Sequence, residues 1–166
     1  MNKKVLFIVN AAVIAALYVV LTLLANALGL ANYAIQVRFS EALTILPFFT
    51  PAAIPGLFIG CILSNFITGC LPWDIVCGSI ATLLGAVGTY FIGKAAAKLP
   101  KLRFLTPLPP VVANTLIVPF VLAYVYRFEG SVPYFMFTVG VGEIISCGIL
   151  GLLLQNVLGR YKKVLF

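Results

Sequence analysis

The stretch 36-QVRFSEALTILPFFTPAAIPGLFIG-60 decides the fold of this chain. Arg38 and Glu41 stand in it between strongly apolar segments. Three prolines then follow at intervals of four residues, from Pro47 to Pro55. Proline removes a backbone donor and clashes with the preceding turn, so we expect a short helix before Pro47 and a new helix after Pro55. Ionisable groups at the start of a short, broken helix are costly in lipid and indicate a functional site.

The composition around this stretch is that of a membrane protein. Hydrophobic residues make up 63% of the 166 residues and charged residues only 9%, whereas about a quarter of the residues in a soluble domain are charged. The length provides about six spans of roughly 20 residues and leaves no room for a soluble domain. The sequence therefore predicts an all-α membrane protein in which residues 1–166 form one domain of six transmembrane helices.

The first apolar run, about residues 5–28, follows two lysines and is longer than the core of a signal peptide. We predict that it is a transmembrane helix, with a signal peptide as the alternative. Small residues form two pairs at four-residue spacing on one face of this helix: Ala11 with Ala15, and Ala12 with Ala16. Such a face lets another helix approach closely, either within the bundle or in a partner protein.

The five remaining helices are expected at about residues 37–49, 54–68, 73–94, 110–126 and 133–158. The second is too short to cross a hydrocarbon core of about 30 Å upright. Small residues recur in the third and fourth helices at spacings of three and four, which places them on one face of each helix. These faces are expected to pack inward and leave the large apolar side chains for lipid.

Basic residues set the expected topology. They cluster at both ends of the chain and in the loop from Lys94 to Arg103, and all three clusters favour the cytoplasmic side. Both termini and this loop share one side only if the short second helix also crosses, which gives four spans before the loop and two after it. We therefore expect a multi-pass protein of the plasma membrane with cytoplasmic termini and with Arg38, Asp74 and Arg127 near the outer face.

The chain has only four acidic residues: Glu41, Asp74, Glu129 and Glu143. Glu143 lies about ten residues into the last helix, at about half the hydrocarbon depth. A carboxylate there predicts a substrate or ion site, with a structural hydrogen bond to another helix as the alternative. Asp74 could instead be a solvated cap, because the helix dipole favours an acid near a helix N-terminus. Glu41 has Arg38 one turn before it and could pair with it.

Amide and aromatic side chains complete a candidate pocket that opens to the outside, with apolar walls around a few polar groups. A planar ligand with hydrogen-bonding groups suits it, because carboxylates accept from N–H groups and aromatic faces stack on rings. Trp73 has the alternative role of an interfacial anchor. The candidate binding residues are Glu143, Asn114, Glu41, Asp74, Asn65, Arg38, Gln36, Trp73, Phe39 and Tyr134.

Other chemistry is missing from the sequence. Without histidine, histidine-based catalysis and most zinc sites are excluded. The four cysteines lack metal-ligand spacing; Cys70 and Cys77 could pair, but a role as small packing residues suits them better. The chain has no G-x-x-x-x-G-K-[S/T] loop for ATP. We expect no catalytic residue, no metal and no bound cofactor, and energy for uptake would come from a partner or an ion.

Four ordered blocks, RFSEALTILPFFTPAAIPGLFIG, WDIVCGSIATLLGA, ANTLIVP and VGEIISCGILG, resemble the QueT-type substrate-binding subunits of energy-coupling factor transporters. The resemblance extends from Ala11 to about Leu158. It implies capture of a queuosine precursor, a 7-deazaguanine base or queuine, from outside. It also implies docking, through the alanine face of the first helix, on a membrane coupling subunit with two cytoplasmic ATPases that use the ATP, and toppling of the whole subunit to carry the pocket inside.

The ligand contacts are our inference from the residues. Glu143 is the first choice for accepting the N–H donors of a deazaguanine in a bidentate way. Glu41 or Asp74 would meet the cation of an aminomethyl precursor, and Asn114 and Asn65 would bind the carbonyl.

Three alternatives stay open. A subunit of this class could carry another vitamin or an amino acid, for example thiamine or tryptophan, because folds of this kind host many ligands. An ion-coupled secondary transporter could use Glu143 as a proton site, although the two halves show no convincing inverted repeat. A membrane enzyme is disfavoured because the sequence offers no pair of nucleophile and base.

Overall fold

The computed structural model describes residues 2–30 and 37–165, with side chains up to residue 161. In this part of the chain the regular elements are helical, as the composition predicted. In order they are α1 Lys3–Ala27, η1 Phe39–Phe48, α2 Ala53–Ile67, α3 Pro72–Ala96, η2 Pro100–Leu105, α4 Leu108–Phe120, η3 Val121–Val125, α5 Val132–Glu143, η4 Ile144–Leu150 and α6 Gly151–Leu165. The turns of η1 and η2 are 3-10, and those of η3 and η4 are π.

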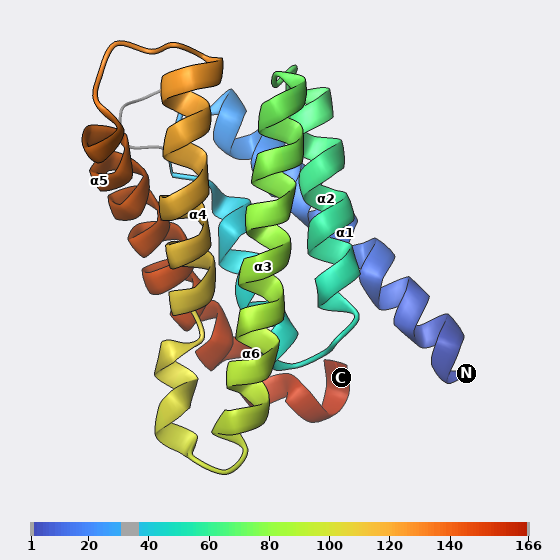
Figure 1. Cartoon of the computed structure of the whole chain (residues 1–166). Helices are drawn as coiled ribbons and strands as arrows, with labels where there is room; N and C mark the ends of the chain where they lie inside the picture. The colour runs from blue at the N-terminus through green and yellow to red at the C-terminus, as the bar shows by residue number, and fades with distance from the viewer. Residues whose placement is uncertain (1, 31–36, 166) are drawn as a thin grey trace.

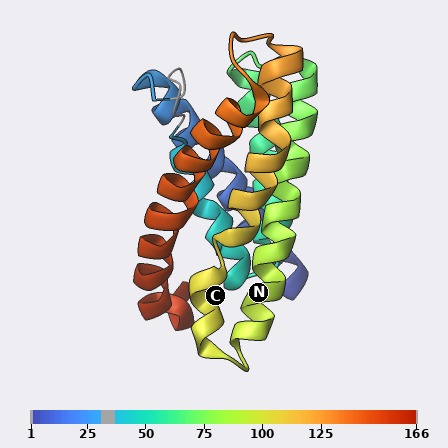
Figure 2. The ribbon, with the colours of Figure 1, turned by 60° about the vertical axis from the view of Figure 1, so that its left-hand side comes forward.

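Successive segments alternate in direction (Figures 1 and 2). Helix α1 runs from one end of the bundle to the other, η1 returns, and α2, α3 and α4 continue the alternation. Helices α5 and α6 form one return run that continues through η4. Helix α1 packs on α2, α2 on α3, α3 on α4 and α4 on α5, while η1 contacts α1, α2, α3, α6 and η4. The short η1 is therefore the central element of the bundle.

The short helix expected before Pro47 is confirmed. Element η1 contains ten residues and includes Pro47, and its residues from Ser40 to Pro47 are buried. At the rise of about 2.0 Å per residue of a 3-10 helix it is about 20 Å long, less than a hydrocarbon core. A new helix does begin in this region, but it begins at Ala53, two residues before Pro55 and not after it. Pro55 therefore lies in the first turn of α2, where a missing backbone N–H costs no helical hydrogen bond.

Four helical runs are long and apolar enough to cross a membrane: Lys3–Ala27, Pro72–Ala96, Pro100–Val125 and Val132–Tyr161. Two shorter apolar helices, Phe39–Phe48 and Ala53–Ile67, complete the set. These runs coincide with the six helices expected from the sequence, and most of their ends differ from the expected ones by a few residues. The exception is the fifth run, which includes η2 and so begins at Pro100, about ten residues earlier than expected. The final run also continues past residue 158.

Both ends of the chain and the segment between α3 and α4 lie toward the same end of the bundle, which we name the basic end (Figures 1 and 2). A hydrogen bond from Arg103 Nη2 to Asn156 Oδ1, at 3.3 Å, joins η2 to α6 there. The turns after α1, α2 and η3 lie at the other end, which we name the open end. The topology expected from the basic residues requires that both ends of the chain and the segment between α3 and α4 lie at the same end of the bundle.

Small residues let the helices approach closely. A Cβ atom at Gly60 would lie 2.8 Å from Tyr18 Cβ and 3.0 Å from Ala15 O on α1. On α3, a Cβ atom at Gly85 would lie 2.7 Å from Pro110 Cα on α4. These approaches leave no room for a side chain, so the inward packing of the small faces is confirmed.

We expect Gly60→Ala to destabilise the protein by about 1–3 kcal/mol, because the added methyl group forces α1 away from α2. Unfolding of the detergent-purified protein by heat or denaturant, followed by its helical circular dichroism, measures the change. Gly159→Ala is the matched control, since nothing lies within 4 Å of the added Cβ atom. An equal stability of the two variants would contradict the close contact at Gly60.

Candidate functional site

Two connected cavities lie in the half of the bundle toward the open end. The outer one, which we name the vestibule, has a volume of about 190 Å³ and is lined by Thr22, Asn26, Arg38, Asn65, Thr68, Cys70, Asp74, Val118, Leu122, Tyr126 and Phe128. The inner cavity, of about 20 Å³, is lined by Arg38, Glu41, Cys61, Asp74, Gly78, Thr82, Asn114, Val118, Val139 and Glu143. Arg38, Asp74 and Val118 line both, so they form the neck between them. The inner cavity has room for about one water molecule.

Glu41 is held in the inner cavity by the central element η1, and its side chain is only 3% exposed. Its Oε1 accepts a hydrogen bond from the Tyr18 hydroxyl of α1. Its Oε2 is buried and has no hydrogen-bond partner among the described residues. A buried carboxylate oxygen without a partner is costly. This atom is therefore suited to accept a hydrogen bond from a ligand.

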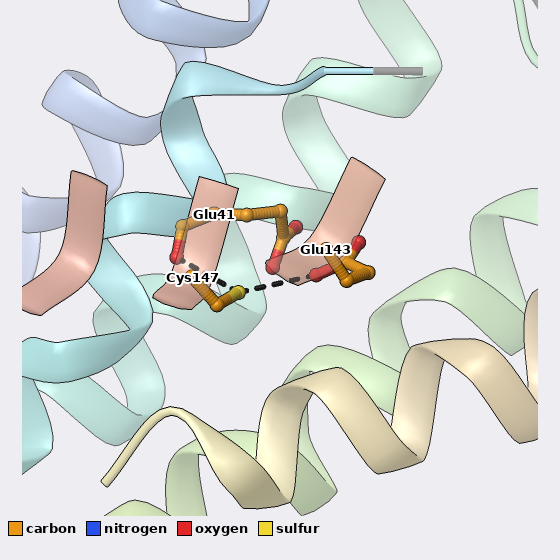
Figure 3. Close-up of side chains that lie close together, drawn as sticks. All are labelled: Glu41, Glu143 and Cys147. Carbon is orange, nitrogen blue, oxygen red and sulfur yellow. Dashed lines mark hydrogen bonds between the residues drawn. The ribbon is translucent and has the colours of Figure 1, made fainter. Parts of the chain in front are cut away.

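Glu143 faces Glu41 from the last residue of α5, where the helix passes into the π turns of η4 (Figure 3). Cys147 lies one turn further, and its Sγ donates to Glu143 Oε2 at 3.1 Å and to the Glu41 carbonyl oxygen at 3.4 Å. One possible ligand atom of each of the three residues lies within 4.8 Å of the others. Two carboxylates this close repel unless a cation or a proton lies between them. The cluster could accordingly hold a metal ion or the cationic group of a ligand.

Two buried amides add further polar atoms. Asn114, 4% exposed, lines the inner cavity, and Asn65, 1% exposed, lines the vestibule. Asn114 Nδ2 and Asn65 Oδ1 have no hydrogen-bond partner among the described residues. A Cβ atom at Gly78 would lie 3.2 Å from Asn65 Nδ2, so the glycine makes room for this amide. The Asn114 amide also lies near the carboxylates of Glu41 and Glu143, with which it interacts weakly. The cavities thus offer one donor and two acceptors that lack a well-formed hydrogen bond at buried positions.

Asp74 is part of the neck and not a solvated cap. It lies in the first turn of α3 but is 7% exposed, and its Oδ2 accepts from the Tyr126 hydroxyl at 2.8 Å. Burial, and to a lesser degree Asp74, raises the pKa of Tyr126 above its ordinary value, so the hydroxyl keeps its proton.

Arg38, the second charged residue of the neck, is held through its backbone. Its N–H donates to Ser146 Oγ at 3.2 Å, which links the start of η1 to η4.

Six of the ten residues expected from the sequence line these cavities: Glu143, Asn114, Glu41, Asp74, Asn65 and Arg38. Trp73 and Tyr134 are 66% and 48% exposed and, like the half-buried Phe39, line neither cavity. The position of Trp73 is compatible with an interfacial anchor. Gln36 lies outside the described residues.

Sequence reasoning missed the hydroxyl and thiol partners of the acids. Tyr18 lies 23 residues from Glu41 in the chain, and Tyr126 lies 52 residues from Asp74. Cys147 was one of the four cysteines without metal-ligand spacing and received no role, yet it contacts both glutamates. The sequence does contain a signal for Tyr18. This residue follows Ala11 and Ala15 on the same face of the helix, so its phenol lies on a face that was expected to pack against another helix.

Comparison with known proteins identifies a family and a relative of this chain. Residues 8–160 match the family described as QueT transporter. The chain is also similar to the queuosine precursor transporter QueT of Lactococcus lactis subsp. cremoris (strain MG1363), with 38% identity over 84 residues. That alignment covers 50% of this chain and 48%, about half, of the relative. No solved structure matches the chain significantly.

Proposed function

Because the chain belongs to the QueT transporter family, we propose that it is the substrate-binding subunit of an energy-coupling factor importer. Its cargo would be a queuosine precursor, a 7-deazaguanine base or queuine, captured from outside. The name of the Lactococcus lactis relative supports this cargo. The observation that carries the proposal is the set of buried polar atoms without partners among the described residues around the two cavities: Glu41 Oε2, Asn65 Oδ1 and Asn114 Nδ2.

These atoms complement a deazaguanine. Its ring and exocyclic N–H groups would donate to Glu143 and Glu41, and its carbonyl would accept from Asn114 Nδ2. The base would occupy the vestibule, where Tyr126 and Phe128 stack with ring centroids 5.3 Å apart, and would direct its N–H edge through the neck. A positively charged aminomethyl group would in addition relieve the repulsion between the two facing glutamates.

The arrangement of charges supports the direction of capture. The basic end would face the cytoplasm, which follows the preference of Lys and Arg for that side, and the vestibule would open to the outside. With this orientation both termini are cytoplasmic, and η1 and α2 complete six crossings of the plasma membrane. Because η1 is only about 20 Å long, it would cross inside the bundle and be shielded from lipid by its neighbours.

A groove on the outside of the bundle would dock the coupling subunit. This alanine groove has a volume of about 530 Å³ and is lined by Phe7, Ile8, Ala11, Ala12, Ala15, Ala16, Val19, Pro55, Ile59 and Leu63. Ala11 and Ala15 approach the glycines of α2, so one stripe packs within the bundle. Ala12 and Ala16 are exposed and leave a flat apolar strip for a partner helix. Two cytoplasmic ATPases bound to the coupling subunit would use the ATP.

The proposal is tested by calorimetric titration of the purified chain, without partners, against guanine, queuine and the cyano- and aminomethyl-deazaguanines. We expect at least one deazaguanine to bind at least about tenfold more tightly than guanine, a difference of about 1.4 kcal/mol. Thiamine and tryptophan are titrated in the same way. Binding of either, or of another vitamin or amino acid, in place of a deazaguanine would overturn the cargo and keep the subunit class. A chain that binds none of these would overturn both.

A further inference from the structure

A third cavity lies at the basic end, opposite the vestibule. It has a volume of about 490 Å³ and lies between the end of η1, η2 and α6. Its lining consists of Phe48, Phe49, Arg103, Gln155, Asn156, Gly159 and Arg160. We name it the basic-end cavity. The capture of a substrate at the open end makes no use of it.

Two arginines, Arg103 and Arg160, line this cavity. The Arg103 guanidinium is fixed by its hydrogen bond to Asn156 Oδ1 and by the ring of Phe104, whose centroid lies 4.8 Å from its Cζ atom. Arg160 follows Asn156 by four residues on α6, so the two side chains lie on one face of the helix. A planar guanidinium held in this way presents several N–H donors in a fixed geometry.

A buried amide adds another donor. Gln155 is 6% exposed, and its Oε1 lies 3.2 Å from the Thr106 hydroxyl, whose single proton is shared with the Arg103 carbonyl oxygen at 2.7 Å. Its Nε2 has no hydrogen-bond partner in the part of the chain that the structure describes. A buried N–H group without a partner is costly unless a ligand or water accepts from it.

The positive charge in this cavity is not balanced by its lining. The four acidic residues of the chain all lie in described segments, and none of them lines the cavity. Glu41, Asp74 and Glu143 surround the vestibule and the inner cavity, and Glu129 lies in the loop before α5. Two arginines and an unpaired amide donor, with no acidic side chain in the described lining, favour an anion, and phosphate groups suit guanidinium forks in particular.

The apolar part of the lining indicates which anion. Phe48 and Phe49 pack edge to face, with centroids 5.0 Å apart, and line the same cavity as the two arginines. The cavity also lies at the basic end, near the ends of the apolar runs, where the hydrocarbon of a membrane would meet water. A lipid has a phosphate for the arginines and an apolar body for the aromatic rings, whereas free phosphate has only the first.

We propose that the basic-end cavity binds the phosphate of an anionic lipid headgroup. The proposal requires only that the basic end lies at a membrane surface. It is independent of which molecule the vestibule captures, so a chain that binds no deazaguanine would leave it intact.

Native mass spectrometry of the full-length, detergent-purified chain, titrated separately with phosphatidylglycerol and phosphatidylcholine, tests the proposal. We expect one phosphatidylglycerol to be retained with clear preference over phosphatidylcholine. Arg103→Gln and Arg160→Gln should each weaken that binding about fivefold, the effect of about one cationic side chain near a lipid surface. The matched control is Lys101→Gln, which removes the same charge from η2 but does not line the cavity. Helical circular dichroism confirms that each variant is folded.

Two further arms separate the sources of phosphate. Inorganic phosphate and glycerol phosphate are added as competitors at the lipid concentration, and we expect neither to displace the lipid. Displacement by either would assign the cavity to a free phosphate and overturn the lipid. Equal retention of the two lipids would show that the negative charge is not recognised. An equal loss in Lys101→Gln and Arg103→Gln would show general attraction to the basic end. Either result would overturn the cavity as a site for an anionic lipid.

Discussion

Replacing Glu143 with glutamine is expected to lower the affinity of the purified chain for a deazaguanine by more than about tenfold, or 1.4 kcal/mol. The carboxylate offers two acceptor oxygens to the N–H edge of the base, and the amide replaces one of them with a donor. That donor would face the N–H donors of the ligand. Losing a charge-assisted contact at two points costs about 1.5–3 kcal/mol of binding free energy. The expected decrease in affinity is therefore at least about tenfold. Calorimetric titration of both proteins measures the ratio.

Glu129→Gln is the matched control for this substitution. Glu129 is exposed in the loop between η3 and α5 and lines neither cavity, so the same chemical change there should leave affinity unaltered. Glutamine has nearly the volume of glutamate, and equal thermal unfolding of the two variants would show that the bundle is intact. If Glu143→Gln binds as tightly as the parent chain, Glu143 is not part of the binding site.

The acids and amides of the site could be found from the sequence because of their cost in lipid. A carboxylate or amide in an apolar helix needs a cavity or a partner, and that requirement alone selected Glu41, Glu143, Asn65 and Asn114. Their partners could not be found in the same way. A tyrosine or cysteine is common in apolar helices, so Cys147 gave no signal until the fold placed it beside both glutamates.

The prolines and the basic residues predicted the order of the helices and which of their ends lie together. The positions of the exposed aromatic residues were predicted less well. Trp73 and Asp74 are adjacent on α3 and therefore point about 100° apart, so only one of them can face the neck. In a helix that is apolar almost all round, the pattern does not indicate which side faces lipid. The π turns after Glu143 lie where η4 packs against η1, a contact between distant segments that no local signal encodes.

Packing contacts also resolved the alanine face, which the sequence left open between two uses. Gly56 and Gly60 of α2 bring Ala11 and Ala15 into the bundle. Neighbouring positions on a helix point in different directions, so Ala12 and Ala16 remain outside. One helix face therefore serves internal packing with one stripe and presents the other stripe to the membrane or a partner.

Replacing Ala16 with leucine is expected to abolish most uptake without weakening capture. If the exposed strip docks a helix of the coupling subunit, a large side chain there holds the two helices apart, because such interfaces depend on small residues. Uptake of labelled precursor by cells that express the coupling module should fall by more than about tenfold. Affinity of the purified chain should stay within about twofold, since Ala16 lies outside the vestibule and the inner cavity.

The matched control for Ala16→Leu is Ala27→Leu, on the same helix. Ala27 is also exposed, but it lies in the last turn of α1 at the open end and does not line the alanine groove. The same increase in volume should therefore leave both uptake and binding intact. Normal uptake by Ala16→Leu would remove the alanine groove from the docking surface. A loss of uptake in both variants would mean that a larger side chain anywhere on the exposed face of α1 impairs uptake. The effect would then not be specific to the alanine groove.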